Sequence, residues 1–196
     1  MQTNLSEKYV YSDKYVRLVD IVFGVVVAQS TAKHSEILFA PQAHPLDFAA
    51  LLGIYLTVIL SWVGYHGSVT KFPYSEAWVG TLRLFADFGI VIVYVYLLRS
   101  IAPNGVVLDA YLRGFLLVFV MWIVSGLLRM AEHGKSASKP GLLFACCFVS
   151  LGLWWVYQPL VLRYSGCQAF WDWLFLCLPV IVMVLFRVIR PRWRWL

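Results

Sequence analysis

The sequence has few charged residues. Only 13% of its 196 residues are Asp, Glu, Lys or Arg, against about 25% in an ordinary soluble domain. Hydrophobic residues make up 61% of the chain, and its mean hydropathy is +0.76. This composition excludes an ordinary soluble domain and predicts a membrane protein. The length leaves room for one domain of several spans and little else.

The sequence also lacks the motifs of a membrane enzyme. It contains no H-E-x-x-H, no G-x-S-x-G, no paired histidines at haem spacing and no dense acidic cluster for a metal. Its four cysteines are Cys146, Cys147, Cys167 and Cys177; three fall in apolar runs, and none has metal-binding spacing. We therefore expect no enzymatic activity, no cofactor and no metal.

Six apolar stretches are long enough to cross a bilayer, which needs about 20 residues per helix. They are about 15–35, 47–67, 77–98, 106–129, 141–162 and 170–189. No small-residue cleavage site follows the first, so we expect it to remain in the protein. The prediction is an all-α polytopic membrane protein, with residues 1–196 forming a single six-helix transmembrane domain.

The basic residues predict the orientation. If the N-terminus is cytoplasmic, most of the 16 Lys and Arg residues fall on the inner side, and Lys33, Arg99 and Arg163 on the outer side. Both termini are then cytoplasmic. Topology also accounts for the net charge of +6, so we expect contact with membrane lipid and no binding of nucleic acid.

Polar residues of the first three helices fall at one depth near the cytoplasmic side. They are Arg17 and Asp20 in helix one, Trp62 and His66 in helix two, and Arg83 and Asp87 in helix three. Charges inside spans are costly and usually face the bundle interior in pairs. We expect these six to form one inner polar cluster. It serves either as a structural clasp or as a layer that shapes or gates a pathway.

The first helix has a face of small and polar residues, whereas its other faces are aliphatic. This face includes Gly24, Val27, Ala28 and Thr31, with Ala32 and Ser35 beyond them. Small residues suit close helix packing, and they also suit the lining of a wide or wetted path.

Two of these helices carry a resemblance to a known family. In helix one, Arg17 and Gly24 have the spacing of an arginine and a glycine that flank a Phe-Ser-Asp signature, although Ile21, Val22 and Phe23 replace that signature. In helix two, Trp62 and His66 match a tryptophan and a histidine. These residues are similar to those of the transmembrane protein 175 family, which comprises six-helix endosomal, lysosomal and prokaryotic potassium channels.

The resemblance implies a homo-oligomer, a tetramer in the prokaryotic members, with helix one around a central pore for monovalent cations. It also implies a multi-pass protein of a prokaryotic inner or plasma membrane. Bulky aliphatic residues ring the pore in that family, and the matching positions here are Ala28, Ala32 and Ser35. Such small side chains put potassium selectivity in doubt.

The sequence leaves three functions open. The first is an oligomeric cation channel, for which potassium is one candidate ion, with Gly24, Val27, Ala28, Thr31, Ala32 and Ser35 lining the pore. The second is a scaffold or accessory subunit that does not conduct. The third, a membrane enzyme, has the least support because its motifs are missing.

Overall fold

The computed structural model describes residues 3–75, 77–134, 140–163 and 165–192, almost all of them helical. The long helices are α1 (Thr3–Lys33), α3 (Pro45–Lys71), α4 (Trp78–Arg99), α5 (Leu108–His133), α6 (Pro140–Arg163) and α7 (Gln168–Arg192). Short elements join some of them: α2 (Ser35–Phe39), strands β1 (Ile101–Ala102) and β2 (Gly105–Val106), and a 3-10 turn at Ser165–Cys167. The expected all-α class is confirmed.

Within the described ranges, six helices are long and apolar enough to cross a membrane. The qualifying segments are Lys14–Lys33, Pro45–Lys71, Trp78–Arg99, Leu108–His133, Leu143–Leu160 and Gln168–Arg187. Each matches one of the six stretches expected from the sequence. This is the helix pattern of a multi-pass membrane protein.

Several helices run further than their apolar stretches. Helix α1 begins at Thr3, α3 continues to Lys71, and α5 continues to His133. Backbone hydrogen bonding of a helix does not stop at the first polar side chain, whereas a hydropathy window does. At its other end, α1 is shorter than its apolar stretch, because it ends at Lys33. Ser35, which was expected in the first helix, therefore lies in the short helix α2.

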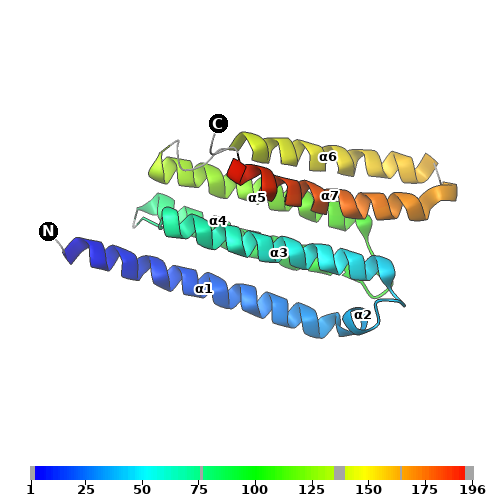
Figure 1. Ribbon diagram of the computed structural model, residues 1–196, viewed down its shortest axis with the longest axis horizontal. Coiled ribbons are helices and arrows are strands. Elements are labelled where there is room, and N and C mark those ends of the chain that lie inside the picture. The colour runs from blue at the N-terminus through cyan, green and yellow to red at the C-terminus, as the bar shows by residue number, and fades with distance from the viewer. Residues whose placement is uncertain (1–2, 76, 135–139, 164, 193–196) are drawn as a thin grey trace.

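The long helices lie side by side along the long axis of the molecule (Figure 1). Helix α1 lies at one edge and packs on α3 and α4, whereas α5 packs on α4, α6 and α7. Helix α1 begins and α7 ends toward the same end of the bundle, which we call the terminal end. The opposite end, with α2 and the β1–β2 hairpin, is the hairpin end.

The bundle carries large apolar side chains on its outside, and it buries some charged side chains within a mainly hydrophobic core. Phe85, Ile92 and Trp155 are 65%, 70% and 73% exposed. Arg83 is completely buried, and Asp87 is only 6% exposed. A surface of this kind suits contact with hydrocarbon, because large apolar areas exposed to water are rare in soluble monomers.

A small β-hairpin closes the connection between α4 and α5. Pro103 and Asn104 form its turn, and Gly105 adopts a φ of +112°, a backbone conformation that favours glycine. The backbone N–H of Val106 donates to Oδ1 of Asp47 at 2.6 Å. Asp47 lies in the first turn of α3, so this bond fixes the hairpin to the start of α3.

Candidate functional site

Three of the six residues expected in the inner cluster come together on the surface between α1 and α3. The indole N–H of Trp62 donates to Oδ1 of Asp20 at 2.9 Å, and Nε2 of His66 lies 2.8 Å from the same oxygen. The rings of Trp62 and His66 stack edge to face, with centroids 4.8 Å apart. We call Asp20, Trp62 and His66 the surface group, because their side chains keep about a third or more of their area exposed.

The expected residues of α4 are buried and bond to other elements. Asp87 accepts a hydrogen bond from the Tyr74 hydroxyl at 2.5 Å and another from the Ser125 hydroxyl at 2.7 Å. Arg83 donates to Glu132 at 2.8 Å, and both side chains are almost fully buried. These five residues, Tyr74, Arg83, Asp87, Ser125 and Glu132, are called the buried charged cluster. They join α4, α5 and the loop between α3 and α4.

That loop is held against the end of α5. The backbone N–H of Ser75 donates to Glu132, and Nε2 of His133 lies 2.9 Å from the Pro73 carbonyl oxygen. The loop places the Tyr74 ring under the Arg83 guanidinium, whose carbon lies 4.6 Å from the ring centroid. Burial, and then the charge of Asp87, raises the pKa of Tyr74 above its ordinary value. The hydroxyl therefore keeps its proton and can donate to Asp87.

Tyr65 lies between the two groups. Its ring stacks edge to face on His66 at 5.5 Å, and its hydroxyl oxygen is 3.3 Å from that of Tyr74. A chain of contacts therefore leads from Asp20 on α1 through α3 to Asp87 on α4. Arg17 lies apart from this chain, with an exposed side chain on α1.

Sequence reasoning missed Tyr74, Ser125 and Glu132. Glu132 was placed in a loop because the fourth expected helix, which corresponds to α5, was expected to end near 129. Ser125, Arg129 and Glu132 are spaced four and three residues apart, so they share one face of α5. This spacing was the available signal. Tyr74 lies in a loop, where hydrophobic periodicity gives no information about the path of the chain.

The face of α1 expected to line a pore is exposed. Gly24, Val27, Ala28, Thr31 and Ala32 are all exposed, whereas Ser35 in α2 is half-buried. The other side of α1 packs on the bundle through side chains that include Val19, Phe23 and Ser30, which are 0–7% exposed, and His34, directly after the helix, is 5% exposed.

Helix α1 also has a polar contact with α3 toward the hairpin end. The Tyr55 hydroxyl lies 3.0 Å from the Ser30 hydroxyl and 3.3 Å from the Thr31 hydroxyl. The Thr31 hydroxyl donates to the Val27 carbonyl at 2.9 Å. These contacts fix the rotation of α1, so that the face with Gly24 and Ala28 points away from the subunit.

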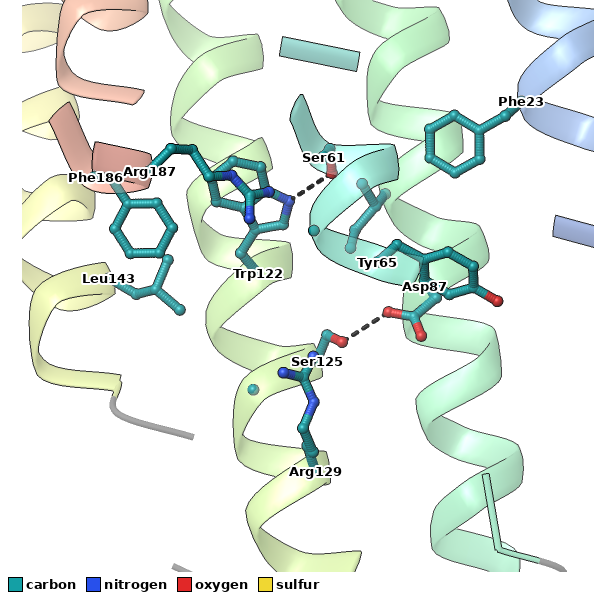
Figure 2. Close-up of a pocket in the computed structure, with 13 residues that line it drawn as sticks. Phe23, Ser61, Tyr65, Asp87, Trp122, Ser125, Arg129, Leu143, Phe186 and Arg187 are labelled. Atoms are coloured by element: carbon teal, nitrogen blue, oxygen red, sulfur yellow. Dashed lines mark hydrogen bonds between the residues drawn. The ribbon is translucent and has the colours of Figure 1, made fainter. Parts of the chain in front are cut away.

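A partly enclosed pocket lies beside the buried charged cluster, and the sequence did not suggest it (Figure 2). Asp87, Arg129 and Arg187 line it together with aromatic residues, which include Trp122 and Phe186. The guanidinium of Arg187 lies over the Trp122 ring, 4.8 Å from its centroid. The Trp122 N–H donates to the Ser61 hydroxyl at 3.2 Å. We call this space the arginine pocket.

The described part of the chain contains no group of three or more His, Cys, Asp or Glu side chains that could hold a metal ion. Cys146, Cys147, Cys167 and Cys177 are free thiols. No protein-family model, curated protein or solved structure matches the chain.

Proposed function

We propose that the six apolar helices cross a lipid bilayer with both termini cytoplasmic, and that the chain forms an oligomeric channel for monovalent cations. The exposed apolar side chains, such as Phe85 and Ile92, support insertion in lipid. Lys14, Arg17 and Lys71 lie toward the terminal end, and the positive-inside rule would keep that end in the cytoplasm.

The exposed small and polar face of α1 carries the channel proposal. A Cβ atom added at Gly24 would meet nothing within 4 Å, so packing inside the subunit does not require a glycine there. Ala28, Thr31 and Ala32 continue the face along the span. Polar groups are costly against lipid, whereas small residues favour close approach of helices. A symmetric oligomer would turn this face toward its axis.

Such a pore would be lined by small side chains. We expect weak discrimination among small monovalent cations, potassium included, because Ala28 and Ala32 are too short to form a tight hydrophobic ring. Val27 is the bulkiest of the lining residues, so a barrier would come from Val27 or from close packing of the α1 helices.

A second candidate is a scaffold or accessory subunit that does not conduct. Arg17 is exposed on the proposed pore face, whereas Asp20 turns toward Trp62 and His66 on α3. At the hairpin end, Asp47 is buried against the hairpin, so its carboxylate is engaged within the subunit. Both observations reduce the attraction that a pore mouth would offer to cations.

The test combines oligomeric state with flux through liposomes. In a chain whose four native cysteines are replaced by Ser, Cys is introduced at Ala28 or Ala32. Matched controls carry Cys at Val22 or Val26, which pack against the core. We expect a membrane-impermeant thiol reagent to block flux only in the Ala28 and Ala32 variants. A monomeric protein, absence of flux, or block confined to the Val22 and Val26 variants would overturn the channel proposal.

A further inference from the structure

Asp87 differs from the other buried acidic residue of the buried charged cluster. Glu132 forms an ion pair with Arg83, whereas the ion pairs among the described residues do not include Asp87. Its two oxygens instead accept hydrogen bonds from the neutral hydroxyls of Tyr74 and Ser125, at 2.5 and 2.7 Å. Asp87 is only 6% exposed. An ionised carboxylate is costly in such a place, and binding of a proton removes that cost.

The Tyr74 hydroxyl has two acceptors for its single proton. Its oxygen lies 2.5 Å from Oδ2 of Asp87 and 3.3 Å from the hydroxyl oxygen of Tyr65. An ionised carboxylate is the stronger acceptor and takes this proton. A protonated carboxyl can itself donate to the Tyr74 oxygen, and the Tyr74 proton is then available to Tyr65. The three side chains can therefore satisfy their hydrogen bonds in both protonation states of Asp87.

The arginine pocket gives Asp87 access to water. It offers about 60 Å³ to the centres of water-sized molecules, whereas about 10–15 Å³ is enough for one water. Tyr65, Asp87 and Ser125 all line it, so polar side chains of α3, α4 and α5 border the same space. Figure 2 shows Asp87 and Ser125 facing one another from two helices, with a hydrogen bond between them. Water in this space can deliver a proton to the carboxylate or remove one.

The charges around Asp87 do not favour one protonation state alone. Burial favours the protonated form, whereas the two hydroxyl donors and the charges of Arg83 and Arg129 favour the ionised form. The pocket residues from α1 and α6, Phe23 and Leu143, are apolar. The titratable or charged groups that face Asp87 or share its pocket are Arg83 of α4, Tyr65 of α3, Arg129 of α5, Arg187 of α7 and Tyr74 of the loop between α3 and α4.

We propose that Asp87 is a proton-binding site in the wall of the arginine pocket, and that Tyr74 changes its acceptor when the proton binds. A hydronium ion in the pocket transfers a proton to Asp87 and becomes water, and an O–H bond forms on Oδ2. This group donates to the Tyr74 oxygen, while the Tyr74 proton stays on Tyr74 and turns to Tyr65. The bond from the loop to α4 becomes neutral, and the loop gains a bond to α3. The site lies within one subunit, so it does not depend on the channel proposal.

The experiment records infrared difference spectra of the purified protein in detergent as the pH is changed. A protonated carboxyl group has a C=O stretching band that an ionised carboxylate lacks. Exposed aspartates titrate near pH 3.9, so they stay ionised between about pH 5 and 8. We expect the parent to show a protonated-carboxyl band that titrates in this range. The band should be missing in Asp87→Asn, whose side chain cannot bind the proton.

Three further variants test the control residue and the two hydrogen-bond partners. Asp109→Asn removes a partly exposed carboxylate from α5 and should leave the band unchanged. Ser125→Ala removes a donor to the ionised form of Asp87, so the midpoint of the titration should rise by about one pH unit or more. Tyr65→Phe removes the second acceptor of Tyr74, which only the protonated state uses. The midpoint should therefore fall, by about one pH unit or less.

The parent protein alone can overturn the proposal, because absence of a titrating carboxyl band would exclude a proton site at Asp87. A band that persists in Asp87→Asn, or that disappears in Asp109→Asn, would belong to another carboxyl group. If Asp87→Asn does not fold, an unchanged midpoint in Ser125→Ala has the same meaning. An unchanged or raised midpoint in Tyr65→Phe would overturn the change of acceptor by Tyr74.

Discussion

The surface group and the buried charged cluster share the terminal end of the bundle but differ in their surroundings. The side chains of Asp20 and His66 are 34% and 36% exposed, whereas those of Arg83 and Glu132 are 0% and 1% exposed. Both pairs have contact distances of 2.8 Å. The two pairs therefore have the same contact distance but differ in how far their side chains are removed from water. This desolvation determines how much stability is lost when one partner is removed.

The largest effect is expected at the buried pair. Arg83→Gln should lower the free energy of unfolding by about 3–5 kcal/mol, because it leaves Glu132 as an uncompensated buried charge. The double variant Arg83→Gln, Glu132→Gln should lose much less than the sum of the two single variants. Denaturant or thermal unfolding in detergent measures these values.

The exposed pair of Arg113 and Asp109 on α5 is the matched control. Its spacing of four residues and its exposure predict a loss of about 0.5 kcal/mol or less on Arg113→Gln. Burial would not be the cause if the losses of unfolding free energy at Arg83 and Glu132 were additive. Equal losses in Arg83→Gln and Arg113→Gln would also contradict it.

A smaller effect is expected for Tyr74→Phe. The substitution keeps the ring next to Arg83 but removes the hydroxyl that donates to Asp87. A hydrogen bond to a charged group contributes about 1.5–3 kcal/mol, compared with about 0.5–1.5 kcal/mol for a neutral one. Tyr55→Phe, which removes a hydroxyl facing Ser30, gives the neutral reference. We expect the unfolding free energy to fall more in Tyr74→Phe, and a larger loss in Tyr55→Phe would refute this.

The surface group should respond weakly. We expect Asp20→Asn and His66→Ala each to cost about 1 kcal/mol or less, with a coupling energy of about 0.2–1 kcal/mol in a double-mutant cycle. Unfolding of the solubilised protein provides the measurement. Coupling as strong as that between Arg83 and Glu132 would mean that the assembled protein buries the surface group.

His34 provides a pH-dependent comparison at the hairpin end, between α1 and α2. Burial, and then the charge of Lys33, lowers the pKa of His34 below its ordinary value of 6.5. As the pH falls below about 6.5, the unfolded chain binds a proton that the folded chain does not, so stability decreases. His34→Gln should remove this part of the pH dependence. An identical pH profile of unfolding in the parent and the variant would rule out a contribution from His34.

Hydropathy predicted the six long helices because crossing a bilayer requires length and apolar composition, both of which are local properties of the sequence. Depth in the expected spans also placed Asp20 next to Trp62 and His66. Neither argument could choose the partner of Arg83. Arg83 was expected in one cluster with Asp87, but it extends to α5 and bonds to Glu132.

The remaining features depend on packing between elements that are distant in the sequence. Tyr74 reaches Asp87 because the loop between α3 and α4 is held by the end of α5. Arg187 reaches Trp122 because α7 packs on both α3 and α5. Hydrophobic periodicity describes one helix at a time, so it could not predict the arginine pocket.

The bond between Arg83 and Glu132 also has a consequence for biosynthesis. The two residues are 49 positions apart in the chain. At a synthesis rate of about 5–20 residues per second, Arg83 is complete roughly 2–10 s before its partner. If the helices enter the bilayer in order of synthesis, α4 carries Arg83 without its bonding partner Glu132 during this interval, and only Asp87 of the same helix offsets its charge. Its stable insertion would then wait for α5, so the two helices would enter the lipid as a pair.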